Sequence, residues 1–323
     1  MKRLIDILEL RRHHDSDGEQ IFIDTYLKDA QELTDPHGTP IAYTIEIGPM
    51  INRVLWSCHI DTMHRAPILN EVERTHQEVW VDTVGTAFVM DTEDCLGADD
   101  GAGAWLLLEM IDANVPGTYI FHRGEEIGCW GSSRVAKHYR DWLATYTHAV
   151  AFDRKGTHSA ITHQMGERGA SDAFANQLIG LIDMGHELDP TGVYTDTAEY
   201  MEIIPECMNF SAGYYNEHRS EETLDTTYLL QLRDALLAVD WNVEFVVDRD
   251  PSVKEYDNWA GNYALPHLLT TTEIASTPTL DIMDWVESTD PYTVAETLKR
   301  MAVELEGDSL LSQLEAEQLY AYS

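Results

Sequence analysis

The sequence predicts an α/β fold, a sandwich in which helices cover a largely buried central sheet. Two short apolar runs of the central-strand type, residues 118–122 and 147–152, are separated by a helical segment around residues 133–144. This alternation of strand and helix is typical of such sandwiches. The apolar stretch 102–113 is too long for a typical strand and ends before Pro116, so we expect a buried helix there.

The other elements follow from apolar periodicity and from turn residues. Near the N-terminus, helical spacing predicts helices over residues 2–12 and about 19–32. After a turn at Pro36, residues 41–47 alternate apolar and polar side chains, as a half-buried strand does. The remaining expected strands are 54–59, 79–81, 86–90 and one near 208–214, and the remaining expected helices are 172–184 and about 223–239.

The composition changes after Asp240, which divides the chain into two predicted parts. We expect a main domain over residues 1–240 and an acidic, partly helical appendage over residues 241–323, with a helix from Pro291 onward. The appendage carries 16 acidic and 4 basic residues, and the whole chain has a net charge of −36, so the acidity is spread over both parts. A salt-adapted host or a charged assembly partner would explain it equally well.

Charge and hydropathy limit the classes of partner. Binding nucleic acid requires clustered Lys and Arg, so a net charge of −36 argues against a nucleic-acid partner. No apolar run approaches the roughly 20 residues of a membrane span, and the N-terminus is charged too early for a signal peptide. We therefore expect a cytoplasmic protein with no membrane partner. The four cysteines form no Cys-x-x-Cys pair, which argues against a zinc finger and a disulfide framework.

Three acidic signatures stand in order along the chain, each just after a short apolar run. They are His59-Ile60-Asp61, Gly97-Ala98-Asp99-Asp100-Gly101 and Gly124-Glu125-Glu126-Ile127-Gly128. Carboxylate oxygens and imidazole nitrogens are ligands with which proteins hold pairs of divalent cations. Residues two apart in a strand face the same way, so His59 can bind a metal while Asp61 orients its ring. Together the signatures predict the core of a two-metal hydrolase.

Each signature taken alone has a simpler explanation. His59 could be an ordinary surface histidine, and Asp99 could merely cap the buried helix that follows it. Two adjacent glutamates are common in a solvated turn, although Glu125 and Glu126 could also divide the work of general base and metal ligand. The order of the signatures, more than any one of them, supports the prediction.

With two later motifs added, the set resembles a known family. The motifs are Ser57-Cys58-His59-Ile60-Asp61, Leu96 to Gly103, Gly124 to Gly128, Phe152-Asp153 and Tyr214-Tyr215-Asn216-Glu217-His218. They resemble those of the co-catalytic zinc aminopeptidases and their relatives, which include bacterial leucyl aminopeptidases, glutamyl aminopeptidases and the carboxypeptidase G and aminoacylase group. The resemblance covers roughly residues 40–240. It implies a three-layer α/β/α sandwich with a mixed central sheet, followed by the appendage.

The resemblance also implies a role for each residue of the motifs. Two divalent metal ions would share one site, with zinc expected and cobalt or manganese also suited to the ligands. The implied roles are His59 and Asp153 for one metal, Glu126 and His218 for the other, Asp99 as the bridge, Asp61 as the residue that orients His59, and Glu125 as general base. Asp196 is a further candidate, for substrate binding, although a Thr-Asp-Thr turn is the commoner explanation.

Two features of the sequence separate the relatives. Asp153 and His218 are 65 residues apart, too few for the large dimerisation domain that carboxypeptidase G relatives insert between these ligands. Gly101 stands where many of those relatives carry Lys. The chain therefore resembles the compact leucyl aminopeptidases, and residues 1–240 are expected to be a di-metal hydrolase domain without an insertion.

The expected function is dinuclear, metal-dependent hydrolysis of peptide or amide bonds, by an aminopeptidase acting on small peptides. A deacylase or carboxypeptidase acting on another small amide would use the same residues. A non-catalytic acidic binding or assembly protein with the same fold is the alternative from another class, and the intact set of ligands argues against it. The sequence leaves open the substrate side chain, the metal used, and whether residues 241–323 mediate oligomerisation.

Overall fold

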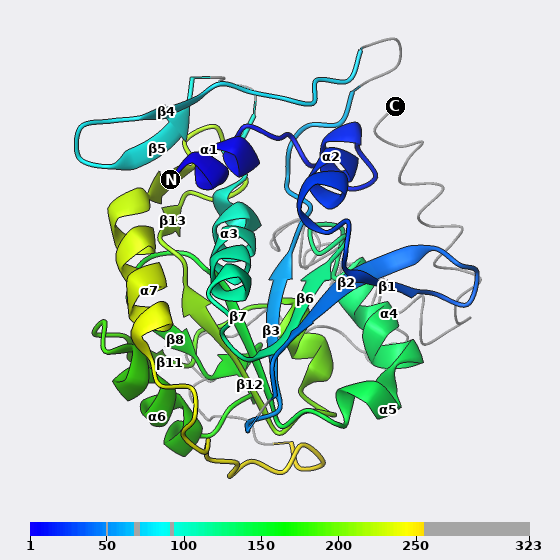
Figure 1. The fold of residues 1–323 in the computed structure, drawn as a ribbon, viewed down its shortest axis with the longest axis vertical. Coiled ribbons are helices and arrows are strands. Elements are labelled where there is room, and N and C mark those ends of the chain that lie inside the picture. Colours follow the sequence, from blue (N-terminus) through cyan, green and yellow to red (C-terminus); the bar gives the residue numbers. More distant parts are fainter. Residues whose placement is uncertain (50, 68–71, 91–93, 255–323) are drawn as a thin grey trace, which may run out of the picture. The chain divides into compact units, whose positions relative to one another are not determined.

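The structure is a computed structural model of the chain, and it describes residues 1–49, 51–67, 72–90 and 94–254 (Figure 1). The helices are α1 (Lys2–Leu8), α2 (Asp17–Tyr26), α3 (Ala98–Asp112), α4 (Trp130–His138), α5 (Arg140–Leu143), α6 (Asp172–Ile182), α7 (Thr226–Ala238) and the 3-10 helix η1 (Asp196–Tyr200). The strands are β1 (Gln31–Thr34), β2 (Pro40–Ile47), β3 (Val54–His59), β4 (Val79–Val81), β5 (Thr86–Val89), β6 (Gly117–His122), β7 (His148–Arg154), β8 (Ser159–Ile161), β9 (His163–Gln164), β10 (Glu167–Arg168), β11 (Glu187–Asp189), β12 (Glu206–Ser211), β13 (Tyr214–Tyr215) and β14 (Thr223–Asp225).

The centre of the main domain is an eight-stranded sheet in the order β1-β2-β6-β3-β7-β12-β8-β11. Strand β3 runs parallel to β6 and β7, and β12 runs parallel to β7, whereas β2 joins β6 in the antiparallel sense. The sheet is therefore mixed. A separate four-stranded sheet has the order β13-β14-β5-β4. Among the residues that the structure describes, no helix combines the length and apolarity that crossing a membrane requires.

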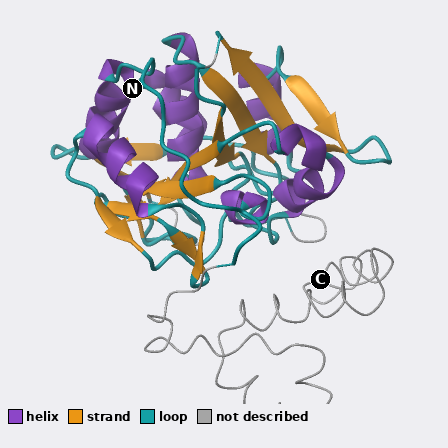
Figure 2. Cartoon of the chain, turned by 90° about the horizontal axis from the view of Figure 1, so that it is seen from below, coloured by secondary structure: helices purple, strands orange, loops and turns teal. Residues whose placement is uncertain are grey.

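Helices cover both faces of the central sheet and form two cores. One core joins α1, α2, α3, α6 and α7 to one face, and the other joins α4, α5 and η1 to the opposite face. Successive side chains of β3 divide between the two cores, since Trp56 and Cys58 lie in the first and Leu55 lies in the second. Figure 2 shows helices on both sides of the strands. The predicted three-layer sandwich is confirmed.

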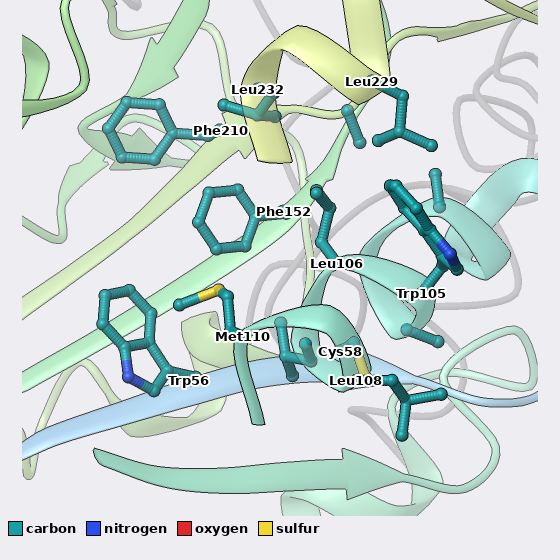
Figure 3. Close-up of a cluster of buried hydrophobic side chains, with 14 of the residues drawn as sticks. Trp56, Cys58, Trp105, Leu106, Leu108, Met110, Phe152, Phe210, Leu229 and Leu232 are labelled. Atoms are coloured by element: carbon teal, nitrogen blue, oxygen red, sulfur yellow. The ribbon is translucent and has the colours of Figure 1, made fainter. Parts of the chain in front are cut away.

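Aromatic side chains fill the first core. Trp56 stacks on Phe152 with 6.2 Å between ring centroids, and Phe210 lies 6.0 Å from Phe152. Figure 3 shows Leu106 and Met110 of α3 among these rings. Because the central strands are buried on both faces, they read in the sequence as nearly continuous apolar runs.

Several element boundaries differ from the prediction, among them the first helix, which ends at Leu8, and the helical segment around residues 133–144, which consists of α4 and α5. Residues 31–34 form strand β1 and not the end of a helix, because pairing with β2 at the edge of the sheet outweighs the local helical pattern. Helix α3 is bounded at Ala98, but Asp99 and Asp100 have non-helical backbone dihedrals, so its regular part begins after Asp100, close to the expected start. The helix expected from residue 223 is preceded by strand β14, which pairs with β5.

Residues 241–254 follow α7 and pack on the main domain. Trp241 is 7% exposed and lies edge-on to Trp56, with 5.1 Å between ring centroids. Phe245 is buried beside Trp241, and Arg249 donates hydrogen bonds to three backbone carbonyl oxygens. The rest of the predicted appendage, with the helix expected from Pro291, lies outside the described residues, and the boundary at residue 240 stays a prediction.

Replacing Trp241 by Ala is expected to lower the free energy of unfolding by about 3–5 kcal/mol, because it empties a buried site against Trp56. Urea unfolding of the purified chain measures the change. The matched control is Trp80→Ala, which alters a 49% exposed ring on β4 and should cost about 0.5 kcal/mol or less. Equal losses in the two variants would contradict the packing of residues 241–254.

His186 predicts a pH dependence of stability. Burial lowers the pKa of His186 from its ordinary value of 6.5 to about 4, and its Nε2 lies 2.7 Å from the Tyr228 hydroxyl. Between these two values the unfolded chain binds a proton that the folded chain does not. Stability contributed by neutral His186 is therefore present above pH 6.5 and is lost as the pH falls toward 4, by about 1–2 kcal/mol at pH 5.

Urea unfolding of metal-free protein at pH 7.5 and pH 5 measures this loss. His186→Gln should reduce the difference in unfolding free energy between the two pH values by about 1–2 kcal/mol. His138→Gln, which alters an exposed histidine at the end of α4, should leave the difference unchanged. The same pH dependence in His186→Gln and in the wild-type chain would show that another group is responsible.

Candidate metal centre

The parallel strands bring the acidic signatures to one edge of the central sheet. His59 ends β3, Asp153 lies near the end of β7, and Glu125 and Glu126 follow β6. Asp99 lies at the kinked start of α3, where the backbone is not yet helical, and α3 packs on β3 and β7. The carboxyl ends of parallel strands meet at the same edge of a sheet, where α/β proteins commonly bind ligands.

Each of the five predicted metal ligands lies within ion-pair distance of at least one of the others. The Nε2 atom of His59 lies 3.2 Å from Oδ1 of Asp99 and 3.7 Å from Oδ1 of Asp153. The Nε2 atom of His218 lies 3.2 Å from Oδ2 of Asp99 and 3.0 Å from Oε2 of Glu126. Asp99 thus turns one carboxylate oxygen toward each histidine and stands between two pairs of side chains. This grouping is the one that the family resemblance implies.

The cluster is buried on one side and open on the other. The side chains of His59, Glu126 and Asp153 are 1%, 6% and 8% exposed, whereas that of His218 is 43% exposed. A cavity of about 150 Å³ adjoins His218, and its other lining residues are Met63, Arg65, Asp94, Cys95, Arg219 and Ser220. Compared with His59, Glu126 and Asp153, His218 is therefore the more exposed member of the cluster.

The cluster holds more negative charge than its histidines balance. Burial raises the pKa of Glu126 to about 7, and the hydrogen bond with His218 offsets the rise only in part. Burial, with the neighbouring charge of Asp99, also raises the pKa of Asp153 to about 6. Burial alone would lower the pKa of His218, but hydrogen bonds with Asp99 and Glu126 raise it to about 11. The carboxyl groups of Glu126 and Asp153, whose pKa values are raised, would therefore be stabilised by an added positive charge.

The donor set suits divalent cations. His59, Asp99 and Glu126 offer ligand atoms within 4.8 Å of one another, and so do His59, Asp100 and Asp153. Oε1 of Glu126 and Oδ2 of Asp100 are buried without a hydrogen-bond partner among the described residues, and a cation would satisfy such oxygens. Mixed imidazole and carboxylate donors fit zinc, cobalt and manganese. Sequence reasoning had given Asp100 no role.

Asp61 connects the first and third signatures. Nδ1 of His59 lies 3.0 Å from the carbonyl oxygen of Asp61 and 3.6 Å from a carboxylate oxygen of the same residue. The two carboxylate oxygens of Asp61 accept hydrogen bonds from the backbone N–H groups of Glu125 and Glu126, at 3.1 and 3.2 Å. Asp61 therefore contacts His59 through its backbone carbonyl oxygen and holds the glutamate turn through its carboxylate. Its role in orienting His59 stays a prediction.

Three residues far along the chain hold Asp153. The hydroxyl group of Thr195 donates to Oδ2 of Asp153 at 2.7 Å, and that of Tyr214 donates to Oδ1 at 3.1 Å. The Asn209 side chain bonds both the N–H and the carbonyl group of Asp153. Sequence reasoning missed these partners. Of the three residues, only Tyr214 could have been noticed in the sequence, because it lies in the motif that ends at His218.

Glu125 occupies a tight turn between β6 and α4. Gly124 and Gly128 have φ values of 69° and 90°, a backbone conformation that favours glycine. Burial raises the pKa of Glu125 well above its ordinary value, and the charge of His59 opposes the rise only in part. The Cys129 thiol donates to Oε1 of Glu125 at 3.5 Å. A carboxyl group of raised pKa beside the ligand cluster is suited to proton transfer.

Asp196 lies in η1 and is only 1% exposed. Its Oδ2 lies 3.1 Å from Nδ1 of His122, and Nε2 of His122 lies 2.6 Å from the Tyr200 hydroxyl. The carboxylate is thus part of a buried polar group beneath the Glu125 turn, and the structure does not bring it into the cluster of five ligands. Its substrate-binding role stays a prediction.

Arg12 is a buried support that sequence reasoning missed. It donates to the carbonyl oxygens of Ile60 at 2.8 Å and Gly97 at 3.3 Å, and so joins the first two signatures. Burial lowers the pKa of Arg12 to about 10, while the charges of Asp100 and Asp61 oppose the shift. Besides the carbonyl oxygen of Ile7, the partners of its guanidinium group are 48 and 85 residues away, and no local pattern marks these two contacts.

Comparison with known proteins gives matches in structure alone, since no family model and no curated protein matches the sequence. The aminopeptidase PepT from Bacillus cereus is 12% identical, with a TM-score of 0.54 over 74% of this chain and 96% of its own. A tripeptidase from Staphylococcus aureus is 12% identical, with a TM-score of 0.56 over 73% of this chain and 95% of its own. The TET1 peptidase of Pyrococcus horikoshii is 16% identical, with a TM-score of 0.53 over 74% of this chain and 99% of its own.

These likenesses define the class of fold. The chain has the mixed α/β fold of the aminopeptidase structures, over nearly their full length and three quarters of its own. A structural likeness at 12–16% sequence identity shows that the fold is shared, but it does not show that the reaction is shared. The reaction must therefore be argued from the side chains of the site.

Adding zinc to metal-free protein should raise the melting temperature, because the cation binds the folded site and not the unfolded chain. At a free zinc concentration of 100 times Kd, the gain is about 2.7 kcal/mol per site. Scanning calorimetry measures the rise in Tm. His59→Ala should remove most of it, and His37→Ala, which alters an exposed histidine outside the cluster, should preserve it. An undiminished rise in His59→Ala would place the metal elsewhere.

Proposed function

We propose that this chain is a dinuclear metal-dependent hydrolase of peptide bonds, an aminopeptidase that acts on small peptides. The observation that carries the proposal is Asp99, whose two carboxylate oxygens lie 3.2 Å from His59 and 3.2 Å from His218. A carboxylate placed between two pairs of ligands is suited to bridging two cations. The fold likeness to structures described as an aminopeptidase and a tripeptidase supports the choice of reaction.

The five ligands divide into two sets that share Asp99. His59 and Asp153 would hold one metal ion, and Glu126 and His218 the other, with zinc as the expected metal. When bound, such ions polarise the scissile carbonyl group and lower the pKa of water. Three carboxylates against two divalent cations leave one positive charge, which suits an anionic nucleophile.

Glu125 is the proposed general base. Its backbone N–H is held by Asp61 at 3.1 Å, and its buried carboxyl group has a raised pKa. It would take a proton from the attacking water and return it to the leaving amine. Asp61 keeps Nδ1 of His59 occupied, so that Nε2 faces the cluster.

The wider proposal concerns the substrate and the assembly. The half-exposed His218 and the cavity beside it would admit one end of a short peptide.

The TET1 peptidase can assemble into a tetrahedron or an octahedral shell, and self-association of this chain through residues 241–323 is a corresponding proposal. Analytical ultracentrifugation of the full chain beside a chain ending at residue 254 tests it.

Glu125→Gln should keep two metal ions per chain and lose about 10²–10⁴-fold in kcat, because the amide cannot accept the proton of the water. Metal analysis of the purified protein and steady-state kinetics give the two numbers. The control is Glu187→Gln, which alters an exposed carboxylate on β11 and should change neither. Full activity in Glu125→Gln, or a wild-type chain without metal after reconstitution, would refute the mechanism.

A substrate panel separates the proposed reaction from its nearest rival. Tripeptides and amino-acid amides with a free amino terminus should be cleaved, and the same peptides with an acetylated amino terminus should not. Cleavage of N-acyl amino acids with no cleavage of free-amine peptides would instead indicate a deacylase. No turnover of any substrate by a folded, metal-loaded chain would indicate a non-catalytic binding protein.

A further inference from the structure

Three backbone N–H groups of the loop that carries Asp99 converge on one buried carboxylate. Gly97 donates to Oε2 of Glu222 at 3.0 Å, and Ala98 and Asp99 donate to Oε1 at 2.8 and 3.1 Å. Glu222 is 1% exposed. It lies four residues after His218, and its own N–H bonds the carbonyl oxygen of Arg219. The segment that supplies His218 therefore also holds the backbone of Asp99.

These three N–H groups lie where the helix offers them no partner. Asp99 and Asp100 have non-helical backbone dihedrals, so the three groups precede the regular part of α3. Buried backbone N–H groups are almost always paired with an acceptor. Gly97, at φ +72°, has no side chain to offer, and a Cβ atom there would lie 2.7 Å from Cε1 of His64. Glu222 supplies the acceptor from far along the sequence.

The loop is also held from its other side. Arg12 donates to the carbonyl oxygen of Gly97 at 3.3 Å, so buried charges of opposite sign bind the N–H and the C=O of the same residue. Asp100, which follows Asp99, fixes the next turn by accepting from the N–H of Gly103 at 2.9 Å. With its neighbours fixed, the carboxylate of Asp99 has little freedom to leave its place between the two histidines.

We propose that Glu222 is a positioning residue that sets the place of the bridging carboxylate of Asp99. The inference rests on the proposed function, because it takes Asp99 to be the ligand shared by two metals. Charge-assisted hydrogen bonds from three N–H groups hold the loop more firmly than neutral ones would. Residues that orient metal ligands typically change metal affinity by about 10–100-fold when they are replaced.

Glu206 provides a matched control for a merely structural role. Like Glu222, it is fully buried and accepts hydrogen bonds from three backbone N–H groups, those of Ser171, Asp248 and Arg249. It lies at the start of β12, opposite His148, whereas the metal centre lies at the other end of the sheet. Loss of its carboxylate should therefore destabilise the fold without reaching the metal ligands.

The test compares Glu222→Gln with Glu206→Gln in the full chain. In Glu222→Gln the new NH₂ group would face backbone N–H groups, so the hydrogen bonds that hold the loop would be weakened. We expect zinc affinity, measured by competition with a chelator, to fall at least about 10-fold, and kcat to fall about 10-fold with KM changed less than about twofold. The visible spectrum of the cobalt-loaded protein should also change. Glu206→Gln should lower Tm and leave zinc affinity and the cobalt spectrum unchanged.

The outcomes separate this inference from the proposed function. Wild-type zinc affinity and cobalt spectrum in a folded Glu222→Gln variant, with two metals bound by the wild-type chain, would overturn the positioning role alone. A wild-type chain that binds no metal would overturn the proposed function. If Glu222→Gln does not fold, Glu222→Asp decides, because the aspartate keeps the carboxylate on a side chain that is one methylene group shorter. Weaker zinc binding in that variant supports the role, and unchanged binding contradicts it.

Discussion

The site depends on burying several carboxylates side by side with too few fixed positive charges to balance them. Asp99, Glu126 and Asp153 share one edge of the sheet with two histidines. Burying an unpaired carboxylate costs several kcal/mol. The same loss of hydration raises the pKa values of Glu126 and Asp153, because it disfavours their charged forms. Protons or cations must therefore complete the cluster. Divalent cations suit its mixed imidazole and carboxylate donors.

Such a cluster can persist only if its loops are held firmly, and buried charged groups do this from several directions. Arg12 binds carbonyl oxygens of the first two signatures, Glu222 binds the N–H groups at the start of α3, and Asp61 binds those of the glutamate turn. Arg123, just before that turn, pairs with the buried Glu19 of α2 at 2.7 Å. The N-terminal segment carries no predicted ligand, yet it supports the site through Arg12 and Glu19. Fixed donors and acceptors of this kind are the basis of preorganisation.

The sequence predicts the parts of this arrangement that depend on local pattern. Apolar runs identify the central strands, and polar residues just after them identify the edge where His59, Asp153 and the glutamate turn meet, because parallel strands end together. Strand β1 could not be predicted, since its pairing with β2 and not its own periodicity makes it a strand. The supporting roles of Glu222 and Arg12 could not be predicted for a related reason. Each acts on backbone atoms 48 to 125 residues away, and such contacts leave no pattern in the sequence.

The acidity of the chain bears on the choice between the two closest functions. Lys and Arg number 21 against 57 Asp and Glu, and at least four of the arginines, Arg11, Arg12, Arg123 and Arg249, are buried. At least eight Asp and Glu residues are buried as well, so the surface keeps most of the strongly negative charge of the chain. Such a field attracts cations toward the site and repels anions, by an amount that falls with salt. At neutral pH the termini of an unblocked peptide carry one positive and one negative charge, whereas an N-acyl amino acid carries only the negative charge of its carboxylate. The negative field therefore repels an N-acyl amino acid more than a peptide with a free amino terminus, which supports the proposed aminopeptidase reaction over the deacylase reaction.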